Sequence, residues 1–126
     1  MKKIIYLFVM AMLVSGCATV SLSKIASDNK GNLKKLGVGM SEQEILNIMG
    51  TKKVRSAIWN LYTVINNPYR SEIVQTKSGK KLKVLYYFTN ARKGVAWEKY
   101  SVVEGDLTPL VFEDGKFIGK EFELIE

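Results

Sequence analysis

Apolar residues form one continuous run near the start of the chain and periodic patterns after it. The run extends from Ile4 to Val14 and follows the basic pair Lys2 and Lys3. It is shorter than the ~20 residues that a helix needs to cross a bilayer, and no second run of this kind occurs downstream. A basic start, a short apolar segment and small residues after it are typical of an export signal, which would occupy residues 1–16.

Helical periodicity is clearest between Met40 and Gly50. Ser41 is suited to the N-cap position, and Glu44, three residues later, completes a capping box. Apolar residues follow at helical spacing, and Gly50 is of the type that commonly ends a helix. The pattern predicts a short helix from about Glu42 to Met49, which needs a larger packing partner to be stable.

A weaker helical spacing precedes this segment, from Leu22 to Leu36. Gly31 interrupts it, and the turn-like residues Ser27 to Lys30 weaken it further. The segment is equally suited to a flexible tether. We predict that residues 17–36 form a tether and that residues 37–126 form the folded domain.

Strand-like patterns begin at Val54, where β-branched and aromatic residues become frequent. Ala57 to Ile65 is predicted to be one strand. Glu72 to Lys77 and Lys80 to Thr89 are predicted to form a hairpin around Ser78–Gly79. A two-residue turn would place two lysines opposite each other, so a longer loop is also possible.

The second strand of this hairpin alternates cleanly. Its even-numbered residues are expected to point into the core, and Tyr87 to point away from it. The expected core residues are Leu82, Val84, Tyr86 and Phe88. Residues 90–106 contain two glycines among aromatic and β-branched residues and are either a long loop or an irregular strand.

A second hairpin is predicted around Asp114–Gly115, because this dipeptide lies between alternating apolar residues. A two-residue turn would pair Glu113 with Lys116, whose charges are opposite. The alternation after the hairpin suggests that residues 121–126 extend the final strand. The other expected pairs are Phe112 with Phe117 and Val111 with Ile118.

A helix followed by antiparallel strands predicts an α+β fold. Without residues 1–16, the chain is long enough for one compact domain and too short for two. Cys17 is its only cysteine, so we expect no disulfide. Histidine is absent, which removes the commonest metal ligand and the commonest general base. We therefore expect no metal, no catalytic residue and no enzymatic activity.

Basic residues outnumber acidic ones, 19 against 12, which gives a net charge of +7. They lie in short groups, such as Lys34–Lys35 and Lys52–Lys53, and not along one helix face. They are either ordinary solvated loop charges or a surface that meets anionic lipid head groups. Nucleic acid is not an expected partner of an exported chain.

The sequence Val14-Ser15-Gly16-Cys17 resembles the lipobox of bacterial lipoprotein signals. The resemblance implies cleavage between Gly16 and Cys17, a diacylglycerol group on the Cys17 sulfur and an acyl chain on the new amino terminus. Ala18 and Thr19 follow the cysteine, and by the same resemblance they indicate sorting to the outer membrane. The alternative is an uncleaved signal-anchor segment. An anchored domain is expected to face the periplasm.

The domain itself resembles the SmpA/OmlA (BamE-like) family of small outer-membrane lipoproteins. The likeness is carried by Val38 to Ser41, Glu44–Ile45, Ile48 to Thr51 and the hairpin Phe112 to Gly119. It implies a two-layer sandwich, with short N-terminal helices packed on a curved antiparallel sheet, as in β-lactamase inhibitor proteins. It also implies a role in outer-membrane assembly or maintenance.

Aromatic residues are the remaining candidates for a binding site, because one short helix cannot cover all of them. A partner-binding patch is predicted on residues whose position opposes the core or that lie in loops. We expect an envelope protein as the partner, in addition to outer-membrane lipid bound through the anchor. An inhibitor or a lipid-binding module on the same fold is the alternative, and a hydrolase that uses Glu113 and Asp114 is a third possibility. The predicted patch consists of Tyr62, Tyr69, Arg70, Tyr87 and Trp97.

Overall fold

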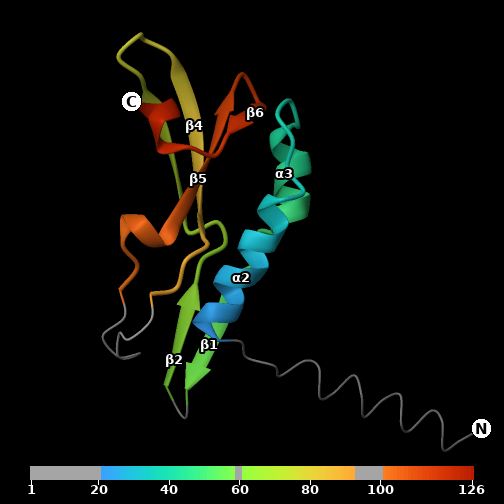
Figure 1. Cartoon of the computed structure of the whole chain (residues 1–126), viewed down its shortest axis with the longest axis vertical. Helices are drawn as coiled ribbons and strands as arrows, with labels where there is room; N and C mark the ends of the chain where they lie inside the picture. Colours follow the sequence, from blue (N-terminus) through green and yellow to red (C-terminus); the bar gives the residue numbers. More distant parts are fainter. Residues whose placement is uncertain (1–20, 59–60, 93–100) are drawn as a thin grey trace, which may run out of the picture.

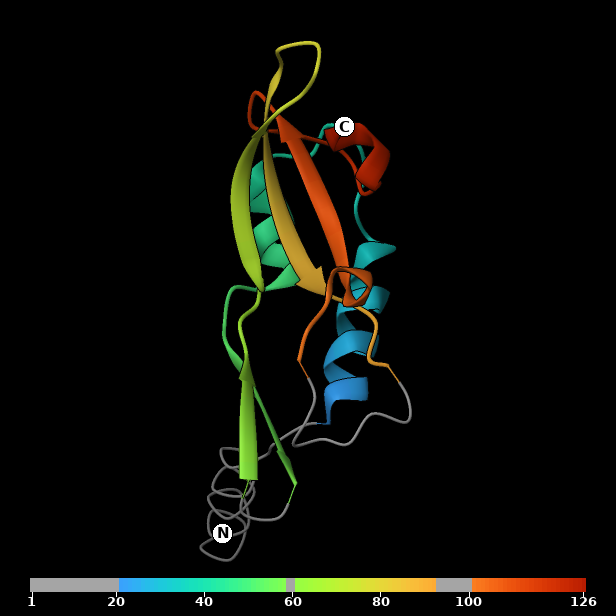
Figure 2. The same cartoon turned by 90° about the vertical axis from the view of Figure 1, so that its left-hand side faces the viewer.

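The computed structural model describes residues 21–58, 61–92 and 101–126. Two helices lie against a four-stranded antiparallel sheet, and a two-stranded ribbon extends from one end of it (Figures 1 and 2). The α+β fold class is thereby confirmed. The helices are α2 (Leu22–Leu33) and α3 (Glu42–Met49), the ribbon is β1 (Val54–Ile58) with β2 (Leu61–Ile65), and the sheet consists of β3 (Arg70–Gln75), β4 (Lys81–Phe88), β5 (Leu107–Glu113) and β6 (Lys116–Gly119).

Helix α2 occupies most of the segment predicted to be a tether. Ser21 caps it by accepting a hydrogen bond from the Lys24 amide, at 3.1 Å. Ile25, Ala26 and Leu33 are buried in the core. Burial of this apolar face stabilises a helix that its own sequence favours only weakly. The prediction that residues 22–36 form a tether is therefore wrong, because this segment is part of the folded domain.

Helix α3 has the predicted limits. The Ser41 hydroxyl oxygen accepts from the Glu44 amide at 3.2 Å, and Gly50 ends the helix with φ of +89°. Ile45 and Met49 are buried against the sheet. The connection before the helix also covers the outer edge of β6.

The segment Gly39–Ser41 runs beside β6 in the antiparallel direction. The Gly39 amide donates to the Phe117 carbonyl at 2.9 Å, and the Phe117 amide donates to the Met40 carbonyl at 2.8 Å. The Glu42 amide donates to the Gly115 carbonyl at 3.2 Å. This edge of the sheet is therefore closed by the chain itself.

The predicted single strand from Ala57 to Ile65 is wrong: it contains the end of β1 and all of β2, which pair as a two-stranded ribbon. β1 and β2 pair from Val54 with Ile65 to Ile58 with Leu61. Between Ile58 and Leu61 the sequence has no glycine or proline, and Asn60 is the only residue there of a type that favours turns, so the signal for two strands was weak.

The hairpin of β3 and β4 has the longer of the two expected loops. Gln75 and Lys81 are the last paired residues before the loop, and Gly79 has φ of +88° within it. The sheet order is β3-β4-β5-β6, so β3 is an edge strand.

Strand β4 is buried on both faces, which corrects the prediction that only its even-numbered residues point into the core. Two core clusters lie on its opposite faces. The first core cluster contains Leu85 and Tyr87 with residues of α3, β5 and β6. The second core cluster contains Val84, Tyr86 and Phe88 with Ile25 and other residues of α2, β2 and β5.

The hairpin of β5 and β6 forms as predicted at its tip. Glu113 pairs with Lys116 and Phe112 with Phe117, and Asp114 takes a positive φ of 50° in the turn. Val111 pairs with Gly119 and not with Ile118, because the register shifts between Val111 and Phe112.

The end of the chain differs from its prediction. Phe122–Ile125 forms a 3-10 helix, η3, and does not extend β6. Phe122 and Ile125 pack against the second core cluster. The undecided stretch contains a second short 3-10 helix, η2 (Glu104–Asp106), directly before β5. Among the helices in the described part of the chain, none is both long enough and apolar enough to cross a membrane.

Candidate functional site

The residues predicted to bind a partner do not form one surface. Tyr87, the first choice, has no exposed area and lies in the first core cluster. Its hydroxyl donates to the Gly50 carbonyl at 2.8 Å, and burial raises the pKa of Tyr87 to about 12. The assignment of Tyr87 to a partner surface is therefore wrong, because α3 covers the face that was expected to be open.

Arg70 is at the surface but already has partners. Its guanidinium lies 4.1 Å from the centroid of the Tyr86 ring and donates to both carboxylate oxygens of Glu104, at 2.9 and 3.0 Å. Burial opposes the charge of Arg70, but hydrogen bonds to Tyr86 and Glu104 outweigh this effect and raise its pKa. Arg70 thus joins the start of β3 to η2.

Tyr86 connects the same group to the edge of the sheet. Its ring is buried, while its hydroxyl donates to the Glu72 carboxylate. Burial, followed by this hydrogen bond, raises the pKa of Tyr86. Tyr69 is half-buried and packs against the second core cluster. Tyr69 and Arg70 thus make contacts within the fold, Tyr69 with the second core cluster and Arg70 with Tyr86 and Glu104.

The other predicted residues lie outside the description. The side chain of Tyr62 is not described, and Trp97, Gly16 and Cys17 lie in segments outside residues 21–58, 61–92 and 101–126. Their predicted roles stay predictions.

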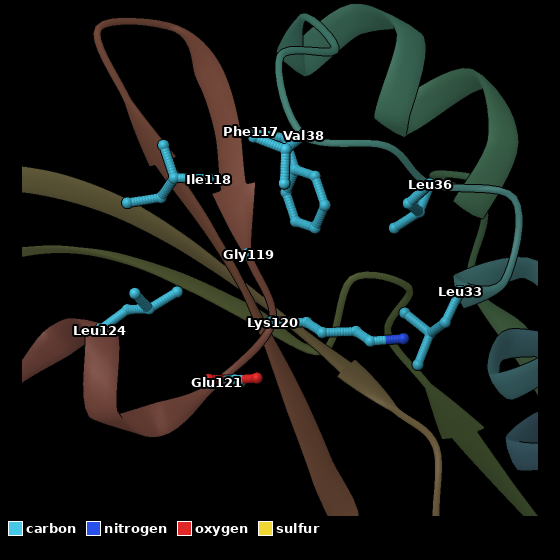
Figure 3. Close-up of a pocket in the computed structure, with 9 residues that line it drawn as sticks. All are labelled: Leu33, Leu36, Val38, Phe117, Ile118, Gly119, Lys120, Glu121 and Leu124. Atoms are coloured by element: carbon cyan, nitrogen blue, oxygen red, sulfur yellow. The ribbon is translucent and has the colours of Figure 1, made fainter.

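An apolar groove that sequence reasoning missed lies between α2, β6 and η3. It has a volume of about 330 Å³. Figure 3 shows Leu33 and Leu36 on one side of it and Ile118 and Leu124 on the other. Val38, at the mouth, is 76% exposed. The remaining lining residues are Phe117, Gly119, Lys120 and Glu121.

The groove suits an apolar side chain with a polar surrounding. Most of its lining side chains are apolar. Its only charged lining groups are Lys120 and Glu121, which are exposed. Neither residue has a nucleophile or a histidine beside it in the lining. Among the described residues, no group of three or more His, Cys, Asp or Glu side chains could hold a metal ion. The groove can bind by shape and apolar contact.

The hydrolase possibility gains no support at the hairpin tip. Glu113 lies 3.8 Å from the Lys80 ammonium group, and Asp114 occupies the turn itself.

A family model described as "Protein of unknown function (DUF3192)" matches residues 12–121. The chain belongs to this family. The match covers every helix and strand from α2 to β6, and it also includes Gly16 and Cys17. The comparisons found no match among curated proteins and none among solved structures. The likeness to the SmpA/OmlA family stays a prediction.

The DUF3192 match also contains most of the groove. Leu33, Leu36 and Val38 lie within it, as do the β6 residues, whereas Leu124 lies beyond its end. The sequence offered one signal for this site, a valine between two glycines at Gly37-Val38-Gly39. Periodicity alone treats such a segment as an entry turn to the next helix.

Proposed function

We propose that this chain is a lipoprotein of the outer membrane, anchored through Cys17, whose periplasmic domain binds an envelope protein during assembly or maintenance of that membrane. The observation that carries the proposal is the distance along the chain between Cys17 and the start of the fold. Ser21 already caps α2, so only Ala18 to Val20 lie between. At ~3.5 Å per residue, this link reaches at most about 14 Å.

Such a short link would determine where the domain lies relative to the membrane. A lipid group on Cys17 would hold the first turn of α2 at the bilayer surface, since two or more acyl chains give a lasting anchor. The domain would then act on molecules within or beside the membrane. Binding without catalysis fits the apolar groove, which offers contact surface and no reactive group.

We also propose a specific architecture for the domain. Helix α3, packed on one face of an antiparallel sheet, agrees with a two-layer sandwich of the type found in β-lactamase inhibitor proteins. That architecture is the one that the SmpA/OmlA resemblance implies. In this view the groove beside β6 receives an apolar side chain of the partner protein.

The anchor is tested with Cys17→Ser, and with Thr19→Ser as the matched control. We expect the Cys17 variant to lose the lipid mass and to leave the membrane fraction or stay unprocessed, and the control to behave as the parent. Intact-mass measurement of the purified chain and sedimentation of membranes provide the readouts. The same lipid-bearing product from both variants would refute the anchor.

Partner binding is tested separately with a photo-crosslinking residue at Val38 and, as control, at Gln43. Both positions are exposed, but Gln43 lies on α3 away from the groove. We expect a defined protein adduct from position 38 and none from position 43. In a second experiment the crosslinker replaces Lys120, and we expect the protein adduct from this position to be lost when Val38→Glu is added. Lipid adducts without protein would support the lipid-binding alternative, and equal adducts at both positions would remove the groove from consideration.

A further inference from the structure

The outer edge of β3 is open. The sheet order ends at β3, and in the described part of the chain no strand pairs with its outer side. Figure 2 shows β3 at the margin of the sheet, on the side opposite to β6. The two edges thus differ, because Gly39–Ser41 covers β6 and no comparable segment of the described chain covers β3.

The hydrogen bonds between β3 and β4 determine which backbone groups lie on this open edge. The Thr76 amide donates to the Lys80 carbonyl at 2.9 Å, and these two residues continue the register of β3 with β4. In an antiparallel ladder, bonded and non-bonded pairs alternate. Val74 and Glu72 therefore bond to β4, and the amides and carbonyls of residues 71, 73 and 75 point outward.

Ile73 is the middle residue of this outward set. It is 73% exposed, although edge strands usually avoid large apolar side chains. It pairs with Lys83 of β4, whose ammonium group lies 2.6 Å from the Glu42 carboxylate. A groove of about 180 Å³ extends from Ile73 toward Phe112 on this face of the sheet.

We propose that β3 pairs with β3 of a second copy of this chain, in the antiparallel direction, about a two-fold axis at Ile73. The outward set is then self-complementary: Ile73 lies opposite its own equivalent, and Ser71 lies opposite Gln75. Two hydrogen bonds for each of the three pairs give about six in total. The exposed Ile73 side chains of the two copies meet at the centre and are removed from water.

The charges of the strand agree with this register. Glu72 lies opposite Val74 of the second copy, and Arg70 lies opposite Thr76, so no two like charges are directly opposed. A shift by two residues in either direction would lose one of the three bonded pairs and separate the two Ile73 side chains. The register centred on Ile73 is therefore the one that keeps all three bonded pairs and brings the two Ile73 side chains together.

The pairing does not depend on the anchor, so an experiment can refute the pairing without refuting the proposed function, and the reverse. Its axis is perpendicular to the sheet, which places the helices of both copies on the same face. The starts of the two α2 helices then lie at opposite ends of the dimer. With the short link to Cys17, both anchors enter one bilayer if the joined sheet lies along the membrane surface.

Cysteine crosslinking in membranes tests the register with the full chain. In Ile73→Cys, the two introduced thiols belong to a directly opposed pair, whose Cα atoms are ~5.5 Å apart and within disulfide range. We expect a disulfide dimer on mild oxidation. Ser71→Cys alone should give none, because its equivalents are ~13 Å apart, at four residues of ~3.3 Å each. Co-production of Ser71→Cys with Gln75→Cys should give the mixed dimer.

The parent chain provides the background from Cys17 in the same experiment. Equal dimer from Ile73→Cys and Ser71→Cys, or no dimer from Ile73→Cys, would overturn the proposal. As a second measurement, Ile73→Lys places two like charges together and should weaken the dimer by at least about tenfold in sedimentation of the detergent-solubilised chain. Val64→Lys, a partly exposed position away from β3, is the control and should leave the dimer unchanged. An unchanged dimer in Ile73→Lys would contradict the pairing.

Discussion

Tyr86 and Tyr87 are neighbours in β4 and both are buried, but they lie on opposite faces of the sheet in different surroundings. Tyr87 has α3 over it and one backbone carbonyl as its hydrogen-bond partner. Tyr86 lies among charged groups, with Arg70 over its ring and Glu72 at its hydroxyl. The first face is a closed apolar layer, whereas the second is held at its margin by charge pairs that water can reach. Substitutions on the face that α3 covers should therefore lower the free energy of unfolding more than substitutions at the margin of the other face.

The largest effect is expected from Ile45→Ala, which opens a cavity under α3. Ile45 has no exposed area and belongs to the first core cluster. Such a truncation typically lowers the free energy of unfolding by ~2–5 kcal/mol. Urea denaturation followed by circular dichroism measures the loss. Ile48→Ala, at a partly exposed position of the same helix, is the control, and an equal loss there would contradict the closed layer.

The second effect tests a charge pair that is buried on one side only. Asp106 has no exposed area, and the Arg92 guanidinium donates to its carboxylate at 3.1 Å. Arg92→Met leaves this carboxylate with fewer partners, but the Val103 amide still donates to it. The loss of stability should stay below the ~3–5 kcal/mol of a fully buried pair.

Lys24→Met is the matched control for this pair. Lys24 forms an exposed ion pair with Asp28 one helical turn away, and exposed pairs of this kind contribute about 0.3–0.5 kcal/mol. Thermal or urea unfolding of both variants gives the comparison. Equal losses would mean that the burial of Asp106 has no energetic weight.

The third effect separates the two tyrosines by pH. Burial raises the pKa of Tyr87 to about 12, whereas an unfolded tyrosine titrates near ~10. The folded state thus holds the proton more tightly, so this contribution to stability is complete below pH ~10 and is lost as the pH rises toward 12, by at most ~1.4 kcal/mol per unit.

Tyr87→Phe should remove that part of the pH dependence. It also removes the bond to Gly50, which costs ~1 kcal/mol at neutral pH. We therefore expect the difference in free energy of unfolding between parent and variant to shrink from about pH 9 to about pH 11. A constant difference across this range would show that the hydroxyl is not shielded from water.

The smallest effect is expected from Arg70→Lys. The ion pair with Glu104 is exposed on both sides, and such pairs contribute ~0–1 kcal/mol. Lysine keeps the charge but loses the planar group over Tyr86. A loss of more than ~2 kcal/mol in urea unfolding would contradict the view that this margin is exchangeable with solvent.

Local signals in the sequence were sufficient where the structure is local. Ser41 and Glu44 marked the start of α3, and Asp114–Gly115 marked the tip of the last hairpin, because a cap and a tight turn need particular residues at fixed spacing. Both features are present as predicted. The α+β class follows from them.

Features that depend on distant contacts were not predictable in the same way. Helix α2 contains Gly31 and is stabilised by burial of Ile25 and Leu33, and its weak helical spacing could not show whether the segment packs in the core or remains a tether. Alternation in β4 indicated one inward face, but it could not show that α3 buries Tyr87 on the other. The groove is formed by two distant segments of the chain, from Leu33 to Val38 and from Phe117 to Leu124, so no spacing could indicate it.

The cover that Gly39–Ser41 provides for β6 also limits how copies of the chain can assemble. A sheet with two open edges can add strands at both sides without end, which is the route to fibres. Here one side is closed by hydrogen bonds from the same chain. In the four-stranded sheet only β3 can then add a strand of another molecule, so the proposed pairing would stop at two copies, although Ile73 is a bare apolar residue on that edge.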